Sequence, residues 1–161
     1  MSAENVYDVD KLMAEARKLA ANYRKMTGKA LGISSEIALH DVIRLMNLVA
    51  VPVQQGGFDA IGKGAIEGKR IQIKGRTVSP DSKQNQRIGQ IKMDQEWDSV
   101  MLVVMNEDYE ALEIYEAERE SIMEAVGKSN AKRKNRGALT VTRFKHIAKA
   151  VWSQASGIIK E

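Results

Sequence analysis

An almost unbroken apolar run, 99-SVMLVVMN-106, is the feature that most limits how this chain folds. A strand with one solvated face alternates apolar and polar residues, whereas a run without alternation indicates a strand buried on both faces. Such a strand needs packing on each side of its sheet. The next stretch, 111-ALEIYEAE-118, does alternate, and it predicts an edge strand.

Apolar residues at helical spacing predict helices over residues 10–26, 34–48 and 119–126 and from about residue 142. The last helix is expected to bury Phe144, Ile147, Ala148, Val151 and Trp152. Further strands are predicted at residues 49–54, 58–61 and 70–77, followed by a polar loop over residues 79–94. This order of elements predicts an α/β or α+β domain with a central mixed sheet flanked by helices.

The composition fits one globular domain, because 43% of the 161 residues are hydrophobic and 29% are charged. Its core is expected over about residues 28–120, with a basic linker and a C-terminal helix over residues 127–161. The absence of cysteine and the presence of only two histidines argue against a disulfide framework and a zinc site. With no export signal or membrane span in the pattern, we expect a cytoplasmic protein that does not enter membranes.

Charge is distributed unevenly along the chain. Acidic residues dominate between residues 107 and 124, whereas residues 128–149 contain none. Such segregation favours binding of a polyanion, although a run of charge is also commonly a solvated surface. The cations concerned include Lys132, Arg133, Lys134 and Arg136 in the linker and Arg143 and Lys145 in the final helix.

A glycine-rich turn joins two strand-like pieces in 58-FDAIGKGAIEGKRIQIKGR-76. A phosphate-binding glycine loop opens a helix, but a strand follows here, so the glycines are predicted to turn a hairpin. Asp59 and Gln72 can lie side by side on paired strands, and Gln72 and Lys74 face the same way. A half-solvated edge strand fits the same pattern, and the spacing leaves both interpretations open.

The combination of Asp59 with Gln72-Ile73-Lys74 resembles the active-site motif of the PD-(D/E)xK nuclease superfamily, in its Gln-x-Lys variant. The resemblance extends over residues 28–120, including 69-KRIQIKGR-76 and 96-EWDSVMLVVMNEDYEALEIYEAER-119, and points to an uncharacterised subgroup. Two departures stand out. Gly57-Phe58 replaces the usual Pro before the Asp, and Gln72 replaces an anionic ligand, which makes Glu36 more important.

The resemblance implies a restriction-endonuclease-like fold and a Mg²⁺-dependent DNA endonuclease, in which Mn²⁺ can replace Mg²⁺ and no nucleotide cofactor takes part. It implies catalytic roles for Glu36, Asp59, Gln72 and Lys74. The implied metal ligands are Asp59, Gln72, Glu36 and the carbonyl of Ile73. Glu36 matches an acidic position on the helix before the strands, with His40 and Asp41 as alternatives one turn further on.

Lys74 is expected to orient or deprotonate the attacking water, or to stabilise developing negative charge. Further DNA contacts are expected from Arg76, Lys83, Gln84, Gln86 and Arg87, all of which also fit solvated surface. Cutting both strands calls for two active sites and so for a homodimer. The rival interpretations are an inactive DNA-binding module of this fold and a subunit of a larger defence or repair assembly.

The basic linker gives the first prediction. Replacing Lys132, Arg133 and Lys134 together with Ala should weaken DNA affinity equally for every sequence. It should also lower the slope of log affinity against log salt by up to about 0.9 for each phosphate that is no longer neutralised. Fluorescence anisotropy over a salt series measures both quantities. Unchanged affinity and slope would show that the linker is only solvated.

Overall fold

The computed structural model describes residues 9–28, 30–51, 56–78, 86–127 and 139–159. The chain divides into two compact units, Met1–Ile33 and Ser34–Glu161. In the first unit the described element is the helix α1 (Val9–Thr27), close to the predicted bounds. In the described part of the chain, no helix combines the length and apolarity needed to cross a membrane.

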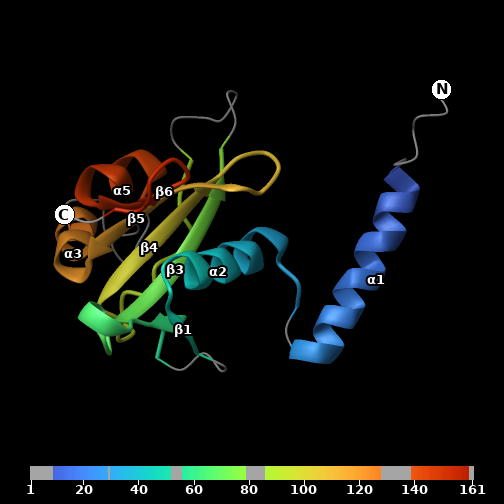
Figure 1. Ribbon diagram of the computed structural model, residues 1–161, viewed down its shortest axis with the longest axis horizontal. Coiled ribbons are helices and arrows are strands. Elements are labelled where there is room, and N and C mark those ends of the chain that lie inside the picture. Colours follow the sequence, from blue (N-terminus) through green and yellow to red (C-terminus); the bar gives the residue numbers. More distant parts are fainter. Residues whose placement is uncertain (1–8, 29, 52–55, 79–85, 128–138, 160–161) are drawn as a thin grey trace. The chain divides into compact units, whose positions relative to one another are not determined.

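A seven-stranded mixed sheet forms the centre of the second unit (Figure 1). Its described strands lie in sequence order: β1 (Val49–Ala50), β2 (Ala60–Ile61), β3 (Arg70–Thr77), β4 (Ser99–Met105), β5 (Ala111–Glu118), β6 (Lys149–Ser153) and β7 (Gly157–Ile158). The helices are α2 (Ile33–Leu45), α3 (Arg119–Gly127) and α5 (Val141–Ile147). The predicted class, a mixed sheet flanked by helices, is confirmed.

The strand β4 is buried along its whole length, as its apolar sequence predicts. Successive residues point to opposite faces of a strand, so its side chains divide between two hydrophobic clusters. Leu102 packs in a cluster with α3 and α5, whereas Met101 and Val103 pack in a cluster with α2. Figure 1 accordingly shows α2 against one face of the sheet and α3 and α5 against the other.

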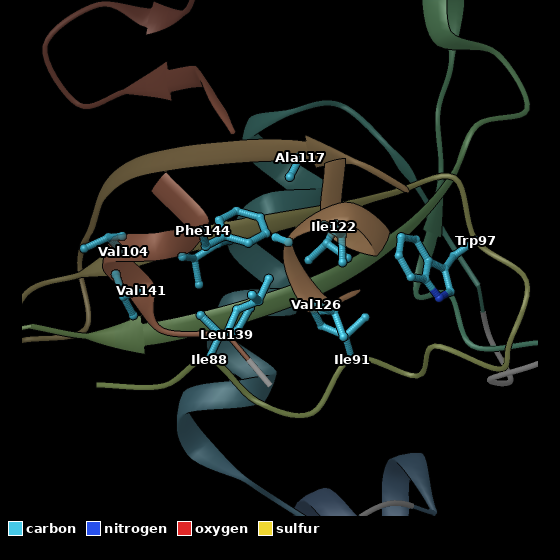
Figure 2. Close-up of a cluster of buried hydrophobic side chains, with 13 residues drawn as sticks. Ile88, Ile91, Trp97, Val104, Ala117, Ile122, Val126, Leu139, Val141 and Phe144 are labelled. Atoms are coloured by element: carbon cyan, nitrogen blue, oxygen red, sulfur yellow. The ribbon is translucent and has the colours of Figure 1, made fainter. Parts of the chain in front are cut away.

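The described part of the connection between β3 and β4 has little regular secondary structure. Because these two strands pair in parallel, the chain has to return along the sheet before β4 begins. The described part of this return, residues 86–98, is termed the crossover below. It places Ile88, Ile91 and Trp97 in the cluster with α3 and α5, with Trp97 at one end of the cluster and Val104 at the other (Figure 2).

Two predictions about the C-terminal half are wrong. The final helix ends at Ile147, and Val151 and Trp152 belong to the strand β6, which pairs antiparallel with β5. The strand β5 is therefore interior. Val and Trp are good strand residues, and pairing with β5 here outweighs a spacing that also suits a helix. The predicted strands at 49–54 and 58–61 are shorter, as β1 and β2, and residues 52–55 lie outside the described residues.

The contact between α2 and β3 gives the second prediction. A Cβ atom added at Gly75 would lie 2.4 Å from the Cβ of Ala38, so Gly75→Ala forces the helix away from the strand. We expect a loss of about 1–3 kcal/mol in the free energy of unfolding, as for other overpacked cores. Urea unfolding measures it. Gly127→Ala is the matched control, because a Cβ there meets nothing within 4 Å, and equal stability of the two variants would contradict this packing.

Candidate functional site

A pocket of about 260 Å³ opens where β3 extends past Ala60, the first residue of β2. It lies within the second unit. Its lining residues are Ser35, Glu36, Leu39, Gly57, Asp59, Gln72, Ile73, Lys74, Arg76, Gly89 and Lys92. The structure thus brings together the predicted catalytic residues, from α2, from the residue before β2 and from β3.

Asp59 is held at the edge of β3 by main-chain and side-chain hydrogen bonds. Its N–H donates to the carbonyl of Ile71 at 2.8 Å, and its Oδ2 accepts from the N–H of Ile73, also at 2.8 Å. The carboxylate therefore occupies the place that another residue of β2 would take in the ladder. Asp59 is partly buried, and its position is set by the strand itself.

The carbonyl of Ile73 points to the same open edge. Alternate residues of a strand direct both their N–H and their C=O groups to the same side, and here Ile71 and Ile73 both bond toward Asp59. Beyond Ile71, no described strand pairs with this side of β3. An oxygen from the Ile73 main chain and the carboxylate of Asp59 thus face one pocket.

Glu36 lines the pocket from the first turn of α2, where it is partly buried. Neither alternative on that helix lines the pocket. His40 is exposed, and Asp41 forms an ion pair with Arg44 at 3.8 Å. Of these three residues, Glu36 is the one that lines this pocket.

Gln72 is buried, with 2% of its surface exposed. Its Nε2 donates to the carbonyl of Gly57 at 2.8 Å, and its Oε1 accepts from the N–H of Lys92 at 3.4 Å. The alternative interpretation of β3 as a half-solvated strand is wrong, because Gln72 is buried and Lys74 and Arg76 are only partly exposed. Among the described strands, β2 pairs with β3 only at Arg70 and Ile71.

The crossover runs back along β3 and binds its cations through main-chain carbonyls. Lys74 donates from Nζ to Gln90 at 2.7 Å, and Arg76 donates from Nε to Arg87 at 2.6 Å. Burial lowers the pKa of Lys74 below its ordinary value of 10.5; the charge of Asp59 opposes this shift, whereas Lys92 and Arg76 reinforce it. Burial also lowers the pKa of Arg76.

The residues predicted to contact DNA are less concentrated than the catalytic set. Arg76 lines the pocket, whereas Gln86 donates from Nε2 to the carbonyl of Thr77 at 3.1 Å and so has an internal role. Arg87 and Arg143 are exposed, and Lys145 lies over the ring of Tyr115, 5.4 Å from its centroid. The remaining members lie outside the described residues: Lys83, Gln84, Lys132, Arg133, Lys134 and Arg136.

Two glutamates of the acidic stretch, residues 107–124, have a structural role that the charge pattern did not indicate. Glu116 is buried, accepts from the hydroxyl of Ser99 at 2.7 Å and lies 3.0 Å from the ammonium of Lys69. Glu118 is 2.6 Å from the same ammonium. Burial lowers the pKa of Lys69, but its hydrogen bonds to Glu118 and Glu116 outweigh burial and raise the pKa overall.

Sequence reasoning did not single out Lys92 or Gly89 as lining residues. In the sequence, Lys92 is one of several charged residues in the polar stretch 79–94. Only the path of the crossover brings it next to β3. The apolar residues of that stretch were the available signal. Ile88 and Ile91 are the isoleucines of that polar stretch, and both are buried.

The oxygen atoms at this pocket suit a hard cation such as Mg²⁺, which prefers carboxylate and carbonyl ligands. They comprise the carboxylates of Glu36 and Asp59 and the Ile73 carbonyl. In the described part of the chain, no group of three or more His, Cys, Asp or Glu side chains forms a metal site.

Comparison with protein-family models finds no match, and comparison with curated proteins finds none either.

The surroundings of Lys74 give the third prediction. In protein labelled with ¹³C-lysine, the Cε resonance of Lys74 should titrate below pH 10.5. Asp59→Asn should lower this pKa further, because it removes an attractive charge, and Lys92→Gln should raise it, because it removes a repulsive one. Lys74→Arg identifies the resonance. Shifts of the same sign in the two variants would contradict the arrangement.

Proposed function

We propose that this chain is a Mg²⁺-dependent DNA endonuclease. The supporting observation is that a carboxylate held at an open strand edge, a main-chain oxygen of the same edge and a lysine of lowered pKa line one pocket. These groups suit phosphodiester hydrolysis, which requires charge neutralisation at the phosphate and an activated water. The resemblance to the PD-(D/E)xK nucleases points the same way.

The metal ligands in this proposal are Asp59, Glu36 and the Ile73 carbonyl. A bound Mg²⁺ would neutralise charge on the phosphate and favour the hydroxide form of a bound water. Asp59 fits this task, because its hydrogen bond to the Ile73 N–H holds the carboxylate before any ion binds. Its position therefore does not have to be established during binding.

Lys74 is the proposed proton-handling group. Burial favours its neutral form, and a neutral amine can accept a proton from water, whereas an ammonium can only donate. Its hydrogen bond to the Gln90 carbonyl fixes the direction of the side chain. Arg76, one alternation further along β3, is placed to stabilise negative charge on the phosphate.

An inactive DNA-binding module is the second candidate. The observation that favours it is that both ends of the Gln72 amide and the ammonium of Lys74 already have main-chain partners. Such a protein would keep the cations of the pocket for phosphate binding and would lack hydrolysis. Cleavage by the wild-type chain decides between the two candidates.

The fourth prediction separates catalysis from binding. Asp59→Asn keeps the shape of the side chain but removes a charged metal ligand, and Lys74→Ala removes the proton-handling group. Each should slow nicking of supercoiled plasmid by at least about 100-fold, the range for removal of a positioned acid or base. Anisotropy should show DNA affinity within about threefold of wild type.

Lys63→Gln is the matched control, because Lys63 is an exposed cation outside the pocket, and it should cleave like wild type. Wild-type protein that binds DNA but cuts none with Mg²⁺ or Mn²⁺ would favour the binding-module candidate. Full cleavage by Asp59→Asn would remove the proposed site.

A further inference from the structure

We propose that Gln72 is a positioning residue that holds Lys92 in place as a phosphate-binding cation of the pocket, and that it is not a metal ligand. This proposal rests on the proposed DNA substrate. It adds Lys92 to the residues that act on DNA and changes the role that the family resemblance implies for Gln72.

The partners of Gln72 determine which end of its amide is which. The Gly57 carbonyl can only accept a hydrogen bond and the Lys92 N–H can only donate one, so Nε2 faces Gly57 and Oε1 faces Lys92. The oxygen that a metal would need is therefore directed at a main-chain N–H. Both ends of the amide join main-chain segments that are distant in sequence.

This arrangement explains why an amide stands where related nucleases have a carboxylate. A glutamate side chain has no N–H group to donate to the Gly57 carbonyl, and its ionised oxygen would face that carbonyl at the distance of a hydrogen bond. Gln72 is buried, so water cannot separate the two oxygens. The site thus favours Gln72 for its donor.

Lys92 is held from its other side as well. Its carbonyl accepts from the indole Nε1 of Trp97 at 2.7 Å and from the N–H of Gln95 at 3.1 Å. Trp97 is itself part of the hydrophobic core, with 1% of its surface exposed. Two buried side chains therefore fix the peptide groups on either side of Lys92.

The side chain of Lys92 remains exposed and lines the pocket. It shares that lining with Lys74 and Arg76. A cation on a fixed main chain loses less conformational freedom when it binds phosphate than one on a mobile loop does. Lys92 is accordingly suited to bind a phosphate next to the one that is attacked.

A double-mutant cycle of Gln72→Met and Lys92→Gln tests this coupling in the full chain, with DNA affinity measured over a salt series. Lys92→Gln should weaken affinity about threefold to tenfold and lower the salt slope by about 0.9. Gln72→Met, although it removes no charge, should lower affinity and slope in the same direction. The double variant should bind no more weakly than Lys92→Gln alone.

Lys63→Gln controls for the removal of one exposed positive charge and should change affinity less than Lys92→Gln does. If Gln72→Met folds poorly, Trp97→Phe replaces it, because it removes the hydrogen bond from the indole to the Lys92 carbonyl. It should lower DNA affinity and the salt slope in the same direction. Amide hydrogen exchange gives a measurement that does not depend on DNA. The Lys92 N–H should exchange at least about tenfold faster in Gln72→Met than in wild type. Gln86→Met is the control, because it removes a different glutamine hydrogen bond, the one to the Thr77 carbonyl.

Calorimetry with Mn²⁺ separates the two roles of Gln72. If Gln72 positions Lys92, Gln72→Glu should not bind Mn²⁺ more tightly than wild type, and tighter binding would overturn the proposal. Additive effects in the cycle, or an unchanged exchange rate at Lys92, would also overturn it. Wild-type protein that binds no DNA would remove both proposals, whereas DNA binding that is insensitive to Lys92→Gln would remove only this one.

Discussion

The parallel pairing of β3 with β4 is the constraint on which the rest of the second unit depends. Parallel neighbours cannot be joined by a tight turn, so the chain must pass back over one face of the sheet. The crossover that results supplies Ile88, Ile91 and Trp97 to the core and covers the polar face of β3. One topological requirement therefore produces both a hydrophobic layer and one wall of the candidate site.

The second consequence comes from unequal strand lengths. The strand β2 begins only at Ala60, opposite Ile71, whereas the antiparallel strand β3 continues to Thr77, and this leaves main-chain groups of β3 facing an open edge. An unpaired edge is normally a liability for a sheet. Here Asp59 takes up the N–H of Ile73, and the guanidinium of Arg76 donates to the Gly75 carbonyl at 2.7 Å. The edge thus becomes a place where side chains are fixed without a neighbouring strand.

The sequence predicted the class of fold, the buried strand β4, the hairpin turn and the convergence of Asp59, Gln72 and Lys74, because each depends on local periodicity or on a short turn. It did not predict β6, since residues 144–152 have a spacing that fits a helix and only pairing with β5 makes them a strand. It also missed Lys92. Lys92 reaches the pocket because the connection from β3 to β4 passes back along β3. No local sequence pattern predicts the path of that connection.

Under the proposed function, the charges at the pocket would account for binding of a polyanion more directly than the overall charge of the chain does. Two carboxylates, Glu36 and Asp59, share the pocket with three basic side chains, Lys74, Arg76 and Lys92, of which Arg76 and Lys92 would attract a phosphate under the proposed function. A carboxylate at position 72 would reduce that attraction and would also break the tie to Gly57. The amide keeps both the charge balance of the pocket and the hydrogen bond to Gly57, so the departure from the nuclease motif that the sequence resembles is consistent with the rest of the site.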